Sequence, residues 1–106
     1  MTQTLDGALK ARLRAVVDER PVTEAELRKL AEEGRAWVLI LVARLDRAER
    51  RLDELSADEE ASLAEIAATF RTVDETGRDL DELRALLRRL DARAREARAA
   101  WLVSTG

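Results

Sequence analysis

The chain has 106 residues, which is enough for one domain with a modest core. Charged residues make up 39% of it, but 22 acidic residues against 19 basic ones leave a net charge of only -3, which argues against disorder driven by one sign of charge. The absence of cysteine and histidine excludes disulfides, thiolate metal sites and histidine catalysis. One proline, four glycines and an apolar share of 46% are typical of coiled coils and helical bundles.

A first amphipathic helix is predicted over residues 4–19. Leucines and valines recur there at helical intervals along one stripe, at Leu5, Leu9, Leu13, Val16 and Val17. Pro21 disfavours helical geometry at the residue before it, so we expect this helix to end by Arg20.

A second, long helix is predicted over residues 24–55. Thr23 and Glu26 form a capping box at its start, and Val22 and Leu27 occupy the positions of a hydrophobic staple. Apolar residues then follow in steps of three and four, the spacing of a coiled-coil or helical-bundle seam. This seam consists of Leu27, Leu30, Gly34, Trp37, Leu41, Leu45, Ala48, Leu52 and Leu55. Two successive steps of four, which end at Leu45, shift its phase.

Residues 36–43 of this helix, AWVLILVA, are eight consecutive apolar residues. A helix that is apolar on all sides for two turns has to be enclosed by several neighbours, whereas a single apolar stripe needs only one. The run is far shorter than the roughly 20 residues that span a bilayer, and Arg35 and Arg44 close its ends. We therefore predict an enclosed apolar belt here and no membrane segment.

A helical hairpin is predicted to follow. Ser56 and Glu59 form another capping box, which favours a short break and an antiparallel return, with a continuous rod through Ser56 as the alternative. Two further helices are predicted over residues 57–76 and 80–103, because the apolar spacing slips near Gly77, a residue that can end a helix. One bent helix through Gly77 is the alternative. The apolar positions are Leu63, Ile66, Phe70, Val73, Gly77 and Leu80, then Leu83, Leu87, Leu90, Ala94, Ala97 and Trp101.

Together these elements predict an all-α fold of three or four helices, in which a short N-terminal helix accompanies a long antiparallel hairpin within a single domain, residues 1–106. Much of the apolar content is alanine, so the core of a single chain would be thin. We therefore predict a homodimer that associates through the apolar belt. The alternative is that the belt is the core of a monomeric bundle, covered by the first helix. The predicted interface residues are Trp37, Val38, Leu39, Ile40, Leu41 and Val42, with Phe70 and Trp101 as secondary candidates.

The chain contains few of the residue types that commonly act as catalytic bases or nucleophiles. The chain also lacks tyrosine, and it has no glycine-rich phosphate loop and no serine elbow. Acidic clusters at residues 58–60 and 79–82 fall at predicted helix starts, where the helix dipole accounts for them. We predict no enzymatic activity, no cofactor, no metal site and no small-molecule substrate. The first residues show no basic start followed by an apolar core, so a cytoplasmic protein is expected.

The functional prediction is a non-enzymatic interaction module, a homo-oligomeric helical bundle that acts as an adaptor, regulator or scaffold. Its expected partner is a second copy of the chain or a helical protein that covers the belt. Nucleic acid is disfavoured as a partner because the net charge is negative.

The alternative function is a DNA-binding regulator, because residues 23–45 resemble a helix-turn-helix. The matching cap and core positions are Thr23, Glu26, Leu27, Ala31, Val38, Leu41, Val42 and Leu45, with Gly34 near the turn. The resemblance implies a recognition helix in the major groove. The outward positions of that helix include Trp37, Leu39 and Ile40 in place of polar side chains that read bases, which favours the interaction module.

Overall fold

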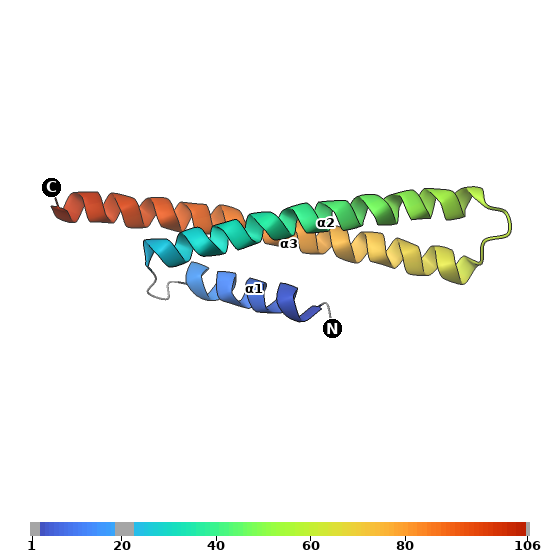
Figure 1. The fold of residues 1–106 in the computed structure, drawn as a ribbon, viewed down its shortest axis with the longest axis horizontal. Helices are drawn as coiled ribbons and strands as arrows, with labels where there is room; N and C mark the ends of the chain where they lie inside the picture. Colours follow the sequence, from blue (N-terminus) through green and yellow to red (C-terminus); the bar gives the residue numbers. More distant parts are fainter. Residues whose placement is uncertain (1–2, 19–22, 106) are drawn as a thin grey trace. The chain divides into compact units, whose positions relative to one another are not determined.

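The computed structural model describes residues 3–18 and 23–105. Within these ranges the chain forms three helices and no strand: α1 Gln3–Val17, α2 Glu24–Ala57 and α3 Leu63–Thr105 (Figure 1). The all-α fold predicted from the sequence is confirmed, with three helices. The first helix ends at Val17, two residues before the predicted end at residue 19, whereas Arg20 and the staple residue Val22 lie outside the described residues.

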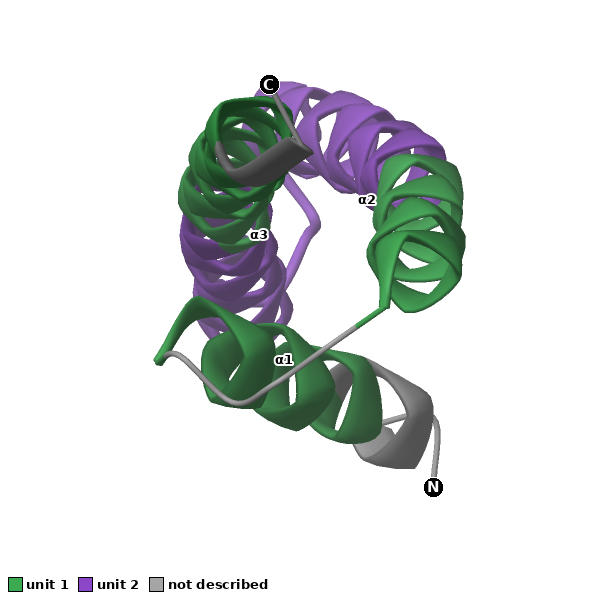
Figure 2. Ribbon diagram, turned by 90° about the vertical axis from the view of Figure 1, so that its left-hand side faces the viewer, with its two compact units in different colours: residues 1–37, 83–106 green, residues 38–82 purple. Residues whose placement is uncertain are grey.

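The chain divides into two compact units (Figure 2). Unit 1 consists of residues 1–37 and 83–106, and unit 2 of residues 38–82. In unit 1, α1 lies against the first part of α2 and the last part of α3, since Arg12 contacts Glu33 and Asp18 lies 4.0 Å from Arg89. In unit 2, the remaining parts of α2 and α3 pack against each other on either side of one turn. The predicted antiparallel helical hairpin is thereby confirmed.

Thr23 caps the start of α2, as the first half of the predicted capping box requires. The backbone N–H of Glu26 donates to Oγ1 of Thr23 at 3.1 Å, and the N–H of Leu27 donates to the Thr23 carbonyl at 3.0 Å. Next to the cap, Glu24 and Arg28 form an exposed ion pair at 3.5 Å. Such a pair adds only about 0.2–0.5 kcal/mol to helix stability. The length of α2 therefore depends on the packing of its apolar seam.

The turn between α2 and α3 differs from the prediction. Ser56 does not cap a new helix, because α2 continues to Ala57. The cap of α3 is Ser62, whose Oγ accepts the backbone N–H of Glu65 at 3.0 Å. The predicted start at residue 57 is wrong, since α3 begins at Leu63.

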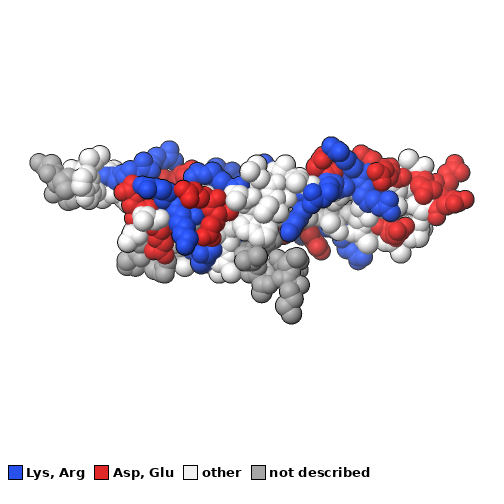
Figure 3. Space-filling view, viewed as in Figure 1, with Lys and Arg blue, Asp and Glu red and all other residues white. Residues whose placement is uncertain are grey.

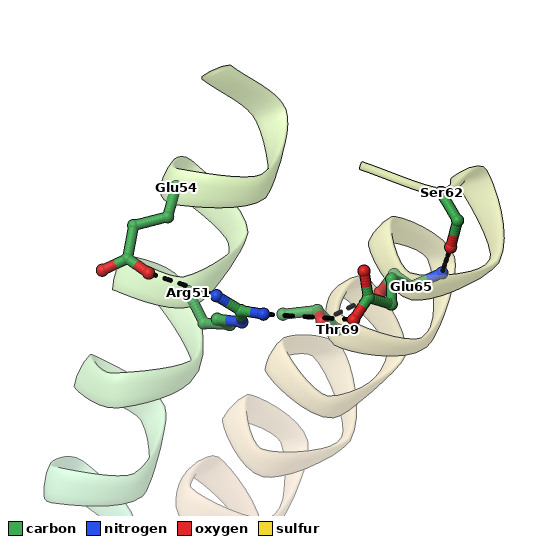
Figure 4. A network of polar contacts seen from close by, with 5 residues as sticks. All are labelled: Arg51, Glu54, Ser62, Glu65 and Thr69. Carbon is green, nitrogen blue, oxygen red and sulfur yellow. Dashed lines mark hydrogen bonds and ion pairs between the residues drawn. The ribbon is translucent and has the colours of Figure 1, made fainter. Parts of the chain in front are cut away.

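A network of polar contacts joins the two helices of unit 2 beside the turn (Figure 4). Arg51 of α2 lies 3.4 Å from Glu54 on the same helix and 3.9 Å from Glu65 of α3. The carbonyl of Glu65 accepts a hydrogen bond from the Thr69 hydroxyl at 2.9 Å, and in the turn the Asp58 carboxylate accepts a backbone N–H at 2.9 Å. The three charged side chains are more than half exposed, so each ion pair contributes at most about 1 kcal/mol. Apolar packing holds the hairpin together.

The predicted apolar seams lie where the helices meet. Every seam residue of α2 is buried or half-buried, from Leu27 to Leu55. In α3 the same holds from Ile66 to Ala94, with the exception of Phe70, which is exposed. The steps of three and four therefore identified the packed sides of both helices.

α3 is one helix through Gly77, so its predicted division into helices over 57–76 and 80–103 is wrong and the alternative of a single helix is correct. The slip in apolar spacing has a different cause. It lies beside the junction of the two units, after which α3 packs against α1 as well as α2. Leu86, which is outside the predicted seam, is accordingly buried. A helix that packs against two neighbours buries a wider stripe of its surface. The line of buried residues on α3 therefore shifts around the helix while the helix itself continues.

The densest core belongs to unit 1, where three helices meet. Each helix contributes large apolar side chains that are at most 5% exposed: Leu9, Leu13 and Val16 from α1, Leu27 and Leu30 from α2, and Leu83, Leu86 and Leu90 from α3. Full burial of such a side chain contributes about 1.5–3 kcal/mol. Unit 1 is therefore the main source of stability in the chain.

Two helix glycines are expected to respond oppositely to substitution by alanine. A Cβ at Gly34 would overlap Cδ2 of Leu87 and lie 3.2 Å from its Cγ, whereas a Cβ at Gly77 has open space around it. Gly77→Ala should raise the free energy of unfolding by about 0.5–1 kcal/mol through helix propensity alone. Gly34→Ala should lower it by about 1 kcal/mol, because overpacking exceeds that gain. Urea unfolding followed by circular dichroism measures both, and equal shifts would contradict the close packing at Gly34.

Candidate functional site

Unit 2 leaves large apolar side chains on its surface. Only three of its residues, Leu41, Leu55 and Leu80, are fully buried. The exposed ones are Leu39 at 72%, Ile40 at 41%, Val42 at 39%, Leu63 at 83% and Phe70 at 58%. Two helices alone cannot enclose a core, so a further element is needed to remove these side chains from water.

Leu39 lies on the side of α2 that faces away from α3. Successive residues are rotated by about 100° around an α-helix, so Leu39 is turned by about 160° from the buried Leu41. Ile40 and Val42 lie on the two flanks, each about 100° from Leu41. The apolar belt thus surrounds α2, and α3 covers only one side of it.

Four exposed residues form one apolar face of α2, which we call the outer face: Ala36, Leu39, Ile40 and Ala43. Their spacing of i, i+3, i+4 and i+7 places them on one side of the helix. Figure 3 shows an uncharged area over the middle of α2, with charged surface on either side of it. The two alanines flank the two large residues, which allows a second helix to approach closely. The outer face is the candidate functional site.

The other predicted interface residues of α2 are less accessible. Trp37 and Val38 are half-buried, and Leu41 is buried at 3% exposure on the side of α2 that packs against α3. The structure therefore brings Leu39 and Ile40 together on the surface and keeps Leu41 inside.

The two secondary candidates lie elsewhere. Counted along the antiparallel pair from the contact of Arg51 with Glu65, Phe70 lies level with about residue 46 of α2, which is at least about 10 Å from Leu39 along the helix axis. Trp101, which is 64% exposed, belongs to unit 1. Neither residue is part of the outer face.

Unit 1 contains a groove of about 390 Å³ between α2 and α3. On α2, Glu33 forms an ion pair with Arg12 of α1 and lies about 170° around the helix from the centre of the residues that line the groove. The groove therefore opens on the side of unit 1 away from α1. Its apolar residues are Leu27, Ala31, Leu90, Ala94, Ala97 and Trp101, and its charged residues are Glu24, Arg28, Arg35, Asp91 and Arg98.

Among the groove residues, sequence analysis had proposed only Trp101 as a site residue. A signal was present in α2, because Glu24, Arg28, Ala31 and Arg35 are spaced at i, i+4, i+7 and i+11 and share one face. That face is mainly charged, so a search for apolar stripes passed over it.

The helix-turn-helix expected from the resemblance over residues 23–45 does not form. α2 is continuous from Glu24 to Ala57 and has no turn at Gly34. Gly34 is instead buried in the helix, close to Leu87 of α3. A recognition helix needs that turn to set its angle to the preceding helix. The turn on which the helix-turn-helix resemblance depends is therefore absent from residues 23–45.

Two further features of the described residues bear on the site. No group of three or more acidic side chains among them is placed so that it could hold a metal ion. None of the helices in the ranges 3–18 and 23–105 combines the length and the hydrophobicity that a membrane crossing requires.

The fold and the exposed faces define the chain as an all-α protein built on a long helical hairpin, with a third, N-terminal helix that forms part of unit 1. No protein-family model, curated protein or solved structure matches the chain.

Proposed function

We propose that this protein is a cytoplasmic, non-enzymatic helical interaction module, which associates with a second copy of itself through the outer face of α2. The observation that carries the proposal is the 72% exposure of Leu39 on a side of the helix that α3 does not cover. Contiguous apolar surface of this kind marks interaction sites in proteins. Covering it releases about 25 cal/mol for each Å² removed from water.

A second copy is the partner that the outer face fits best. From Ala36 to Ala43 the face reads alanine, leucine, isoleucine, alanine, so its pattern of small and large residues is the same in both directions. An antiparallel crossing therefore puts Leu39 beside Ile40 of the second copy and each terminal alanine beside the other. Two-fold interfaces require such a self-complementary patch and are the commonest in homo-oligomers. A module of this kind serves as an adaptor, regulator or scaffold by holding two chains together.

The solution mass tests the proposal. We expect light scattering after size exclusion, over a series from low micromolar to near millimolar concentration, to give a mass of two or more chains that falls on dilution. A mass of one chain throughout, with cooperative unfolding, would contradict self-association and would make the belt part of a monomer core.

A further inference from the structure

We infer that the groove of unit 1 is a second contact surface, which receives the same groove of another copy of the chain in antiparallel orientation. The groove shares no residue with the outer face of α2, so this contact goes beyond the dimer proposed above. Leu27, Ala31 and Leu90 form the floor of the groove and are already buried within the chain, at 5%, 8% and 1% exposure, so a partner meets mainly the rim of the groove. Trp101 adds a large side chain that is 64% exposed.

Charged residues border the groove in the same order on both helices. On α2, Glu24 comes first and Arg35 follows eleven residues later, about 16 Å along the helix. On α3, Asp91 comes first and Arg98 follows seven residues later, about 10 Å along the helix. Each helix therefore presents an acid toward its N-terminal end and a base toward its C-terminal end.

This order makes the groove complementary to itself. A two-fold axis that turns one groove onto another runs each helix antiparallel to its own copy. Glu24 then faces Arg35 of the second copy, and Asp91 faces Arg98 of the second copy. By symmetry each contact forms twice, so these four contacts join opposite charges, whereas Arg28, which is paired with Glu24 of its own chain, comes opposite Ala31 of the second copy.

The midpoint between Glu24 and Arg35 on α2 and the midpoint between Asp91 and Arg98 on α3 lie at nearly the same height along the groove. Gly34 of α2 lies close to Leu87 of α3, which sets the level of one helix against the other. Counted antiparallel from there, the midpoint of the α2 pair falls beside residues 91 and 92 of α3, about 4.5 Å from the midpoint of the α3 pair. An arginine side chain is longer than this offset, so one axis serves both helices.

Among the described residues, three of the four groups that the axis pairs, Arg35, Asp91 and Arg98, form no ion pair within the chain, and the fourth, Glu24, also contacts Arg28 at 3.5 Å. A ligand of a single charge would be attracted by one end of each helix and repelled by the other. A second groove, run antiparallel, places opposite charges at both ends.

The test uses a chain in which the outer face of α2 is already disabled by Leu39→Glu with Ile40→Glu. We expect this variant to keep a mass of two chains at high concentration. Adding Arg35→Glu, or adding Glu24→Arg, should weaken its association at least about tenfold, because each places like charges opposite one another across the axis. Adding both changes should restore it. The two positions are about 16 Å apart in one chain, so the restoration has to come from a second copy.

Two results would overturn the inference: a mass of one chain for the Leu39 and Ile40 variant at every concentration, or a double charge exchange that associates as weakly as the single changes. Circular dichroism checks that each variant is helical. If Glu24→Arg unfolds the start of α2, Asp91→Arg with Arg98→Glu makes the same test in the interior of α3. A different result would contradict the outer-face proposal: the variant with Leu39→Glu and Ile40→Glu would then have the same mass as the wild-type protein.

Discussion

Replacement of Leu39 and Ile40 together by glutamate should lower the mass of the proposed assembly at matched concentration, to no more than the two chains that the groove of unit 1 would hold together, while the chain stays helical. Both side chains lie on the surface, at 72% and 41% exposure, so the fold of unit 2 tolerates polar groups there. In the proposed assembly they would be covered, and each glutamate would bring a carboxylate into an apolar contact. The change acts twice across a two-fold axis, and we expect association to weaken at least about 100-fold. Light scattering at matched concentrations measures it.

A control variant carries the same number of new carboxylates in the same unit. Ala64 and Ala68 of α3 are exposed and lie on the side of that helix away from α2. Ala64→Glu with Ala68→Glu should leave the mass of the assembly unchanged. An equal loss of mass in both variants would attribute the effect to charge in general and would remove the outer face as the contact.

The second large effect is on stability. Leu90→Ala should lower the free energy of unfolding by about 3–5 kcal/mol, because Leu90 is 1% exposed in the core where three helices meet and the substitution leaves a cavity. The whole stability of a domain is only about 5–15 kcal/mol. Urea unfolding, followed by the helical signal, should therefore show a midpoint displaced far toward lower urea.

The matched control for Leu90 is Leu63→Ala, at a position that is 83% exposed in unit 2. A surface substitution of this kind should change the free energy of unfolding by less than about 0.5 kcal/mol. Similar losses in the two variants would mean that the buried core of unit 1 does not dominate stability.

Local signals in the sequence predicted most of the fold. The capping box of Thr23 and Glu26 gave the start of α2 to the residue, because a hydroxyl and a backbone N–H three residues on satisfy each other without help from the rest of the chain. The seam from Leu27 to Leu55 gave the packed side of α2, since burial of apolar residues fixes which side of a helix turns inward.

The turn shows where such signals become ambiguous. Ser56 with Glu59 and Ser62 with Glu65 are equally good capping boxes in the sequence. Only the second is formed, since helical geometry in α2 continues past Leu55. The choice depends on how far the two helices pack against each other, which no stretch of four residues contains.

The division into two units was not predicted from the sequence, although the apolar spacing is irregular near the unit boundaries. The phase shift between Trp37 and Leu45 in α2 and the slip between Gly77 and Leu83 in α3 both lie at or beside the unit boundaries. Each irregularity was interpreted within its own helix, the first as a phase shift of the seam and the second as a break. A helix changes its buried side where its number of neighbours changes, and that number is a property of the tertiary structure.

The candidate site was predicted in part. Leu39, Ile40 and Val42 are exposed on α2, as an interface requires, whereas Leu41 is in the interior and Phe70 is at a distance. Periodicity ranks the sides of a helix by hydrophobicity, but it does not tell which apolar side meets the neighbouring helix of the same chain. The groove of unit 1 was missed because it combines residues about 60 positions apart in the sequence, a separation that local patterns cannot bridge.

The way in which the chain is divided between the two units affects how it folds. Unit 2 is one continuous segment, residues 38–82, whose helices meet on either side of a short turn. Unit 1 joins residues before position 38 to residues after position 82. The entropy lost in closing a loop grows with its length, so the hairpin of unit 2 can close first and hold the distant segments near each other. We therefore expect the hairpin of unit 2 to form before unit 1 and to shorten the loop that the segments of unit 1 have to close.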